Sequence, residues 1–354
     1  MKSVEIINLT DEQFEMYLEL LIEIENKFQE GSMIADNDWS EYQIDYQKIN
    51  FIPEEFKKDK LSKIEERKKN SLKEFVFFEN EKPTGWIALK RISGERYNFI
   101  CDSLYEKFPE ALFEVIKETV FKYLKEAGID NISFWTRDDR KKEAFKNEGI
   151  EIFHEALLSK LYRKDMDIKK LKDIVSENKF IKNYELKLLH EFPEELLENF
   201  TEIMKDVNQE SQLFNPQKKK RKEYTKVDLL GIINADIEDG DPMYMYVLFD
   251  KNKIAAFCRV YIERDSESYF IQHCGGLTGV GKNYRGKGFA KYLKAKMYMK
   301  IIEDYPDFEF ALTDTYPWNK YMYRINEEMG FKPHRKEYAF GFTKEHLEKL
   351  LNRS

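Results

Sequence analysis

The sequence predicts an α/β (α+β) protein made of two similar domains, each a mostly antiparallel mixed sheet flanked by helices. The chain of 354 residues is longer than an ordinary domain of about 100–150 residues, and its 42% of hydrophobic residues are enough for two cores. Two patterns of segments also occur twice along the chain, in the same order. Length, composition and this internal repeat together predict two domains.

The first repeated pattern is a β-hairpin. Residues 75–91 and 246–262 each contain two apolar runs with a polar turn between them, and the second turn follows the first after 171 residues. The second pattern is a short strand, a polar turn, an amphipathic helix and a glycine. It covers 131–150 and 308–331, and its glycines lie 181 residues apart. The two similar offsets indicate two copies of one fold, with a small insertion in the second copy.

Helical and strand periodicities predict the elements in order. In the first copy we expect strand 3–9, helices 11–29 and 54–70, the hairpin, strand 97–101, helix 109–126, strand 131–136, helix 140–148 and a last strand to about 163. In the second copy we expect strand 183–190, helices 194–208 and 219–234, strands 243–250, 253–263 and 269–279, helix 288–304, strand 308–314, helix 320–329, strands within 331–342 and a final helix 343–352. The Lys- and Asp-rich residues 166–182 predict a linker, so the predicted domains are 1–165 and 183–354.

Charge and composition exclude several classes of function. A net charge of −7 argues against a nucleic-acid partner. The basic run 218–222 is interpreted as a solvated segment or, alternatively, as a rim that attracts an anionic substrate. Three cysteines without C-x-x-C spacing predict neither a disulfide framework nor a bound metal. No apolar stretch approaches the roughly 20 residues of a membrane span and the N-terminus has no signal segment, so we expect a cytoplasmic protein without a membrane partner.

Residues 278–290 carry the pattern with the most specific chemistry. They follow a predicted strand and open a predicted helix, and the loop between contains three glycines. Glycine lets a backbone approach a ligand closely, and the free N–H groups of a helix start attract anions. Arg285 and Lys287 add positive charge. The segment therefore predicts a phosphate or pyrophosphate site, although it matches neither the P-loop nor the dinucleotide-binding fingerprint.

Two motifs in this half resemble those of the GCN5-related N-acetyltransferase (GNAT) superfamily. Arg285-x-x-Gly288-x-Ala290 is similar to the Q/R-x-x-G-x-G/A signature of that family. The run from Asn319 through Asn326 to Gly330-Phe331 resembles its second motif, a helix that ends in Gly-Phe. The resemblance implies the GNAT fold, in tandem, and acetyl-CoA as co-substrate, with no metal.

The resemblance also implies particular cofactor contacts. The backbone N–H groups of six consecutive residues would hold the CoA pyrophosphate: Arg285, Gly286, Lys287, Gly288, Phe289 and Ala290. Val280 would pair with the pantetheine arm, and Thr278 begins the same segment. Asn319 would hydrogen-bond the cofactor between two splayed strands. As the residue before a helix, Asn319 also has a simpler interpretation as an N-cap, and the two roles are compatible.

The predicted catalytic residues depart from the family pattern. Asn326 occupies the position where many family members have a tyrosine that protonates the departing CoA thiolate. Tyr323 lies one helical turn earlier and is the candidate substitute, with Tyr316, Tyr321 or water as alternatives. His273, at the end of a predicted strand, is the candidate base that takes a proton from the amine, although a strand histidine is often structural.

The first copy lacks the loop. Its corresponding residues 104–111 contain no glycine, two glutamates and a proline, which cannot approach a pyrophosphate closely. The first copy therefore resembles a degenerate GNAT domain, an architecture similar to that of tandem GNAT proteins such as mycothiol synthase, without any implication about substrate.

The predicted function is transfer of an acetyl group from acetyl-CoA to a primary amine of a small molecule or peptide, by direct attack. Two alternatives remain open: a transferase that uses another acyl-CoA, and a non-catalytic sensor that binds CoA or a metabolite. The chain is expected to be a monomer or a homodimer.

Overall fold

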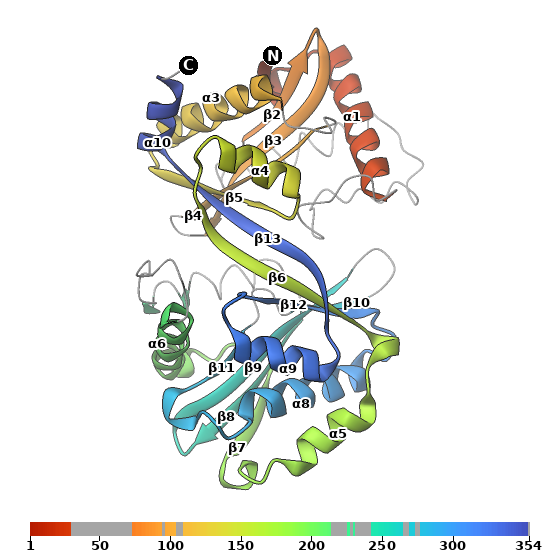
Figure 1. The fold of residues 1–354 in the computed structure, drawn as a ribbon, viewed down its shortest axis with the longest axis vertical. Helices are drawn as coiled ribbons and strands as arrows, with labels where there is room; N and C mark the ends of the chain where they lie inside the picture. The colour runs from red at the N-terminus through yellow and green to blue at the C-terminus, as the bar shows by residue number, and fades with distance from the viewer. Residues whose placement is uncertain are drawn as a thin grey trace. The chain divides into compact units, whose positions relative to one another are not determined.

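The structure of the chain, a computed structural model, divides into two units (Figure 1). Residues 1–155 and 337–354 belong to unit 1, and residues 156–336 belong to unit 2. The described residues are 1–29, 73–93, 96–103, 109–213, 225–226, 229–230, 242–264, 269–272 and 277–352. The predicted helix 54–70, the basic run 218–222 and most of the predicted helix 219–234 lie outside them.

Unit 1 is a mixed sheet with helices on both faces. Its elements are β1 (Lys2–Glu5), α1 (Asp11–Gln29), β2 (Lys73–Glu79), β3 (Lys82–Ser93), β4 (Arg96–Ser103), α3 (Glu110–Ala127), β5 (Asn131–Thr136), α4 (Asp139–Asn147), the start of β6 (Ile152–Tyr162), the end of β13 (Lys332–Thr343) and α10 (Lys344–Leu351). Its strands run in the order β1-β2-β3-β4-β5-β13. In this series β4 and β5 are parallel, and the other neighbouring strands are antiparallel.

Alternation along the β2–β3 hairpin explains why helices cover both faces of unit 1. Phe77 and Leu89 point into a core with α3, whereas Val76 and Trp86 point into a second core with α1. Successive strand residues face opposite sides, so a run of apolar residues requires cover on both sides. The hairpin itself was predicted correctly, and its turn residues Asn80 (φ 50°) and Glu81 (φ 64°) adopt the left-handed conformation that tight hairpins use.

Unit 2 has the corresponding sheet. Its elements are the end of β6, α5 (Ile168–Glu177), β7 (Glu185–Leu189), α6 (Leu197–Leu213), β8 (Met243–Asp250), β9 (Lys253–Arg264), β10 (Tyr269–Gln272), β11 (Thr278–Val280), α8 (Phe289–Asp304), β12 (Phe310–Thr315), α9 (Lys320–Met329) and the start of β13. Its strand order is β6-β12-β10-β9-β8-β7, with β11 paired to β9. Short 3₁₀ turns in the chain lie at Ile6–Asn8, Arg163–Asp165, Ile181–Asn183, Glu194–Leu196 and Lys282–Tyr284.

The two faces of the unit 2 sheet are covered by different helices. Leu248 and Ala256 belong to a core with α5 and α8, and Val247 and Phe257 belong to a core with α6. The alternation again follows the pleat of adjacent strands. Helix α8 therefore lies on one face of the sheet, and α6 supports the sheet from the other.

The predicted domain boundaries at 165 and 183 differ from the units of the structure. In unit 1, β5 pairs with Tyr338–Thr343 of β13, from the end of the chain. In unit 2, β12 pairs with Leu157–Tyr162 of β6, from the first half of the chain. Each sheet thus receives its last strand from the other half of the sequence. Local sequence could not predict this exchange, because backbone hydrogen bonding is the same for either partner strand.

The segment 166–182, predicted to be a linker, belongs to unit 2. Its residues form α5, which packs against α8, with Met166 and Leu171 buried in the core of unit 2. Apolar residues at 168, 171, 174 and 175 follow a helical spacing, and the many charged residues between them occupy the solvent face. Charge density alone had suggested a linker.

Candidate functional site

A gap between two strands of unit 2 is the central feature of the candidate site. The predicted strand 269–279 is two strands, β10 and β11. β10 is parallel to β12 at two positions, Ile271↔Ala311 and Gln272↔Leu312. β11 pairs with β9 on one side, and among the described residues no strand pairs with its other edge. The sheet is therefore split where β11 should continue beside β12.

The open edge of β11 presents backbone groups of Thr278 and Val280. Arg259 N donates to Leu277 O (3.0 Å) and Gly281 N donates to Ala255 O (2.9 Å), so the odd-numbered residues bond to β9. Hydrogen-bonding direction alternates along an antiparallel strand. The N–H and C=O groups of residues 278 and 280 consequently point away from β9. They can pair with an extended ligand that carries amide groups, as an added strand would.

Gly279 keeps β11 close to the rest of the sheet. A Cβ atom at this position would lie 2.5 Å from the ring of Phe257 and 2.7 Å from Val207 of α6. Both contacts are shorter than real Cβ contacts, so glycine is required for this packing. The open edge is therefore supported from behind by β9 and α6.

The loop after β11 has the backbone that its glycines predicted. Gly286 (φ 76°) and Gly288 (φ 74°) are both left-handed, a conformation that is costly for other residues. Gly288 is the N-cap of α8, and no side chain caps that helix start. A helix start without a capping side chain leaves N–H groups for a ligand, and the helix dipole favours an anion there.

The two basic side chains of the loop make internal contacts. Arg285 donates to the carbonyl oxygens of Val280 (3.4 Å) and Asp206 (3.1 Å). Lys287 donates to the hydroxyl of Tyr184 at 2.7 Å. Both side chains thus anchor the loop to neighbouring elements while contributing positive charge near it.

Sequence reasoning missed three residues that hold the loop. Asn178 donates to the carbonyl oxygen of Lys287 (3.1 Å), and the carboxylate of Asp206 accepts from the N–H of Lys282 (2.9 Å). Tyr184 is the third, through its contact with Lys287. They are separated from their partners by 109, 76 and 103 residues, so no local motif could have shown them.

The helix of the second motif begins as its N-cap interpretation predicted. The side chain of Asn319 accepts a hydrogen bond from the N–H of Met322 at 3.2 Å. Just before it, the rings of Tyr316 and Trp318 stack with centroids 4.9 Å apart. The contact of Asn319 with a cofactor stays a prediction.

The candidate catalytic residues have different surroundings. Asn326 is 2% exposed and makes two buried hydrogen bonds, accepting from Lys294 (2.7 Å) and donating to Thr315 (2.9 Å). Tyr323 is half-buried, and its hydroxyl makes no hydrogen bond within the described part of the chain. His273 lies outside the described residues. The structure thus brings Asn326 into the core, and no described residue bonds to the Tyr323 hydroxyl.

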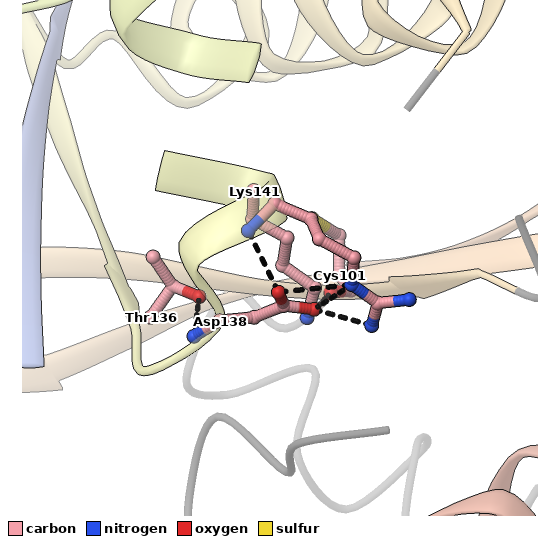
Figure 2. Close-up of polar contacts among 5 residues, drawn as sticks. Cys101, Thr136, Asp138 and Lys141 are labelled. Carbon is pink, nitrogen blue, oxygen red and sulfur yellow. Dashed lines mark hydrogen bonds and ion pairs between the residues drawn. The ribbon is translucent and has the colours of Figure 1, made fainter. Parts of the chain in front are cut away.

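The corresponding region of unit 1 is arranged differently (Figure 2). β4 and β5 are parallel at Asn98↔Ser133 and Phe99↔Phe134. Beyond these positions Lys141, only 1% exposed, donates to the carbonyl oxygen of Cys101 at 2.7 Å.

Asp138 caps helix α4 beside this lysine (Figure 2). Its carboxylate accepts from the backbone N–H of Arg140 at 2.8 Å and forms an ion pair with the guanidinium of the same residue. Burial raises the pKa of Asp138, but the hydrogen bonds from Arg140 and the charge of Lys141 outweigh it, so the pKa lies below its usual value. This carboxylate therefore stays ionised within a buried polar cluster of unit 1.

Comparison with known proteins identifies the fold. No family model matches the chain, and no curated protein matches its sequence. A solved tandem GNAT protein from the clavulanic acid biosynthesis pathway, determined without acetyl-CoA, is similar over 77% of this chain and 83% of its own length, with 12% identity and a TM-score of 0.58. The chain has a tandem GNAT fold.

Two further solved structures are similar. A GCN5-related N-acetyltransferase from Sphaerobacter thermophilus matches 77% of this chain and 80% of its own, with 10% identity and a TM-score of 0.49. A protein from Enterococcus faecalis described as a probable N-acyltransferase matches 98% of this chain and 73% of its own, with 9% identity and a TM-score of 0.46.

The tandem GNAT fold accounts for the repeat in the sequence. Within the described ranges no helix is long and apolar enough to cross a membrane. The same ranges contain no group of three His, Cys, Asp or Glu residues placed to hold a metal ion.

Proposed function

We propose that the chain is an N-acetyltransferase that uses acetyl-CoA and acts on a primary amine of a small molecule or peptide. The observation that carries the proposal is the open edge of β11, which leads directly into a glycine loop and an uncapped start of helix α8. The edge suits an extended chain with amide groups, and the loop suits a pyrophosphate. Acetyl-CoA combines both chemical groups in one molecule.

The residues present fit such a ligand. Thr278 and Val280 offer backbone groups to the pantetheine, and the N–H groups from Arg285 to Ala290 surround the place for the pyrophosphate. Asn319 stands at the start of α9, after the strand on the opposite side of the gap. The solved tandem GNAT protein with a similar fold is itself described by reference to acetyl-CoA, which is consistent with this choice of co-substrate.

The proposed reaction needs a base and a source of protons. The amine nitrogen attacks the thioester carbon, the carbon–sulfur bond breaks, and the sulfur leaves with the bonding electrons. A base takes the proton of the amine, and we retain His273 or water for this role. The thiolate then receives a proton from Tyr323 or from water, because the amide of Asn326 cannot act as an acid near neutral pH.

Binding and turnover test the proposal separately. Calorimetry with acetyl-CoA is expected to give one site per chain. A thiol-release assay with polyamines, aminoglycosides and peptides is expected to identify at least one amine that accelerates CoA release. Absence of acetyl-CoA binding would contradict the proposal, and longer acyl-CoA donors in the same assay decide the acyl group.

A non-catalytic sensor is the second candidate, and Asn326 favours it. Its amide is held by Lys294 and Thr315, at the position where the resemblance expects an acid. Tight binding of acetyl-CoA without thiol release for any amine in the panel would support the sensor.

A further inference from the structure

A chain of buried polar side chains lies beside the gap in the unit 2 sheet. The ammonium group of Lys294, on α8, is 1% exposed and donates to Asn326 Oδ1 at 2.7 Å. Asn326 Nδ2, on α9, donates to Thr315 Oγ1 at 2.9 Å. Thr315 is the last residue of β12, beyond the two positions at which β12 pairs with β10. These three hydrogen-bonded side chains therefore reach from α8 to the β12 side of the gap.

The charge of the same lysine also acts on Cys258 of β9, the residue that pairs with Thr278 of β11. Thr278 Oγ1 lies 3.3 Å from the sulfur of Cys258 and hydrogen-bonds with it. Burial raises the pKa of Cys258 to about 11, while the hydrogen bond with Thr278 and the charge of Lys294 act in the opposite direction. Burial also raises the pKa of the neighbouring Tyr298 well above its usual value. Both groups are neutral near neutral pH, so the positive charge of Lys294 acts on Cys258 with no negative charge from these two side chains to balance it.

The two hydrogen bonds that connect Lys294, Asn326 and Thr315 each have only one possible direction. A lysine ammonium is a donor only, so Asn326 must turn its oxygen towards Lys294 and its NH₂ towards Thr315. The oxygen of Thr315 is thereby the acceptor. Its own hydroxyl hydrogen has no acceptor within the described part of the chain, and a hydroxyl hydrogen can rotate to meet a ligand.

We propose that Thr315, oriented by Asn326 and Lys294, donates a hydrogen bond to the sulfur of CoA and, with the Lys294 charge, stabilises the thiolate. The inference rests on the proposed function, because it requires the CoA sulfur to enter the gap. When the carbon–sulfur bond breaks, the bonding electron pair stays on sulfur, and the negative charge develops next to this donor. Oriented donors and a nearby cation in a water-poor site are effective at that moment. Thr315 would be catalytic, and Lys294 and Asn326 would be positioning residues.

The pKa of the bound CoA thiol tests the inference without knowledge of the amine. The thiolate is titrated by its ultraviolet absorbance in the complex with CoA, and the complex with desulfo-CoA, which lacks the sulfur, is the blank. We expect the thiol pKa to lie at least about one unit below that of free CoA titrated in the same buffer, which below the pKa is a tenfold increase in thiolate at a given pH. Thr315→Val and Lys294→Met should each remove most of this shift. Thr315→Ser, which keeps the hydroxyl, should retain it.

Each outcome decides a different point. If CoA binds but its thiol pKa is unshifted, or if the shift survives in both Thr315→Val and Lys294→Met, the inference is wrong while the proposed function stands. If the protein binds no CoA, both fail. If Lys294→Met does not fold, Thr315→Val decides alone, because valine has the same shape as threonine and preserves the strand.

Discussion

Unit 1 and unit 2 contain the same gap with opposite consequences. In each unit two parallel strands pair at two positions and then separate. In unit 2 the backbone groups of Thr278 and Val280 beyond that point are directed away from β9, and among the described residues the carbonyl of Val280 accepts from Arg285. In unit 1 the ammonium of Lys141 bonds to Cys101, which occupies the same hairpin register as Thr278. Among the described residues, the edge of β11 in unit 2 thus has no strand partner, whereas a buried side chain of unit 1 bonds to the corresponding edge of β4.

The helices beside the two gaps, α4 in unit 1 and α9 in unit 2, also differ at an equivalent position. Asn326 lies 181 residues after Phe145, the offset of the repeat. Phe145 packs against the rings of Phe134 and Phe340, whereas Asn326 links Lys294 to Thr315. The position is structural and apolar in unit 1 and polar in unit 2. Equivalent positions on the two helices thus connect polar side chains in unit 2 and pack aromatic rings in unit 1.

The largest expected effect is a loss of acetyl-CoA affinity when the glycine loop of unit 2 is altered. Gly288→Glu should reduce acetyl-CoA affinity by more than about 100-fold, because it places a side chain in a left-handed residue and a negative charge at the helix start. Gly149→Glu in unit 1 is the matched control, since Gly149 (φ 79°) is equally left-handed and lies in open space. Calorimetry measures both variants. Equal loss of binding in the two would show that the effect comes from strain and not from a site in unit 2.

The next effect concerns catalysis in unit 2. Tyr323→Phe should lower kcat at least about tenfold with little change in acetyl-CoA affinity, because general acid catalysis contributes about 10²–10⁴-fold and only the hydroxyl is removed. Tyr321→Phe is the control, since Tyr321 is 71% exposed on the same helix. Thiol release with an accepted amine provides the rates. Normal turnover of Tyr323→Phe would assign the proton to water or to Tyr316, or to Tyr321 if Tyr321→Phe is the slow variant.

Replacing the lysine that closes the unit 1 gap should lower the stability of the protein without creating a second acetyl-CoA site. Lys141→Met introduces the residue found at the corresponding position in unit 2, Met322. It leaves the buried carbonyl of Cys101 without this donor, so the free energy of unfolding should fall by about 1–3 kcal/mol. Denaturant unfolding measures this change. Calorimetry should still give one acetyl-CoA per chain, and a second site would mean that Lys141 alone prevents binding in unit 1.

The smallest expected effect concerns the loop arginine. Arg285→Ala should weaken acetyl-CoA binding by less than about tenfold, which is about 1.4 kcal/mol, because Arg285 bonds to backbone carbonyls and the loop keeps its N–H groups. Arg140→Ala, in unit 1, should leave binding unchanged. Loss of binding in Arg285→Ala as severe as in Gly288→Glu would assign the pyrophosphate to the side chain.

The sequence by itself determined the elements and motifs that depend on near neighbours. The hairpins, the helix that begins after Asn319 and the left-handed glycines at 286, 288 and 330 all agree with local patterns. Caps, turns and glycine conformations involve residues a few positions apart, so the sequence contains their cause. The same local signals made the resemblance to the GNAT superfamily recognisable.

Tertiary structure alone decided how those pieces are completed. β6 and β13 exchange between the two sheets, since any strand can pair with any compatible edge. The sequence has 59 lysines and arginines, and the side chains of Lys141 and Lys294 are buried. No local sequence signal distinguishes these two lysines from the solvated ones. Their roles depend on partners 40 and 32 residues away, at Cys101 and Asn326. Only folding brings those partners within hydrogen-bonding distance, and this decides which gap stays open.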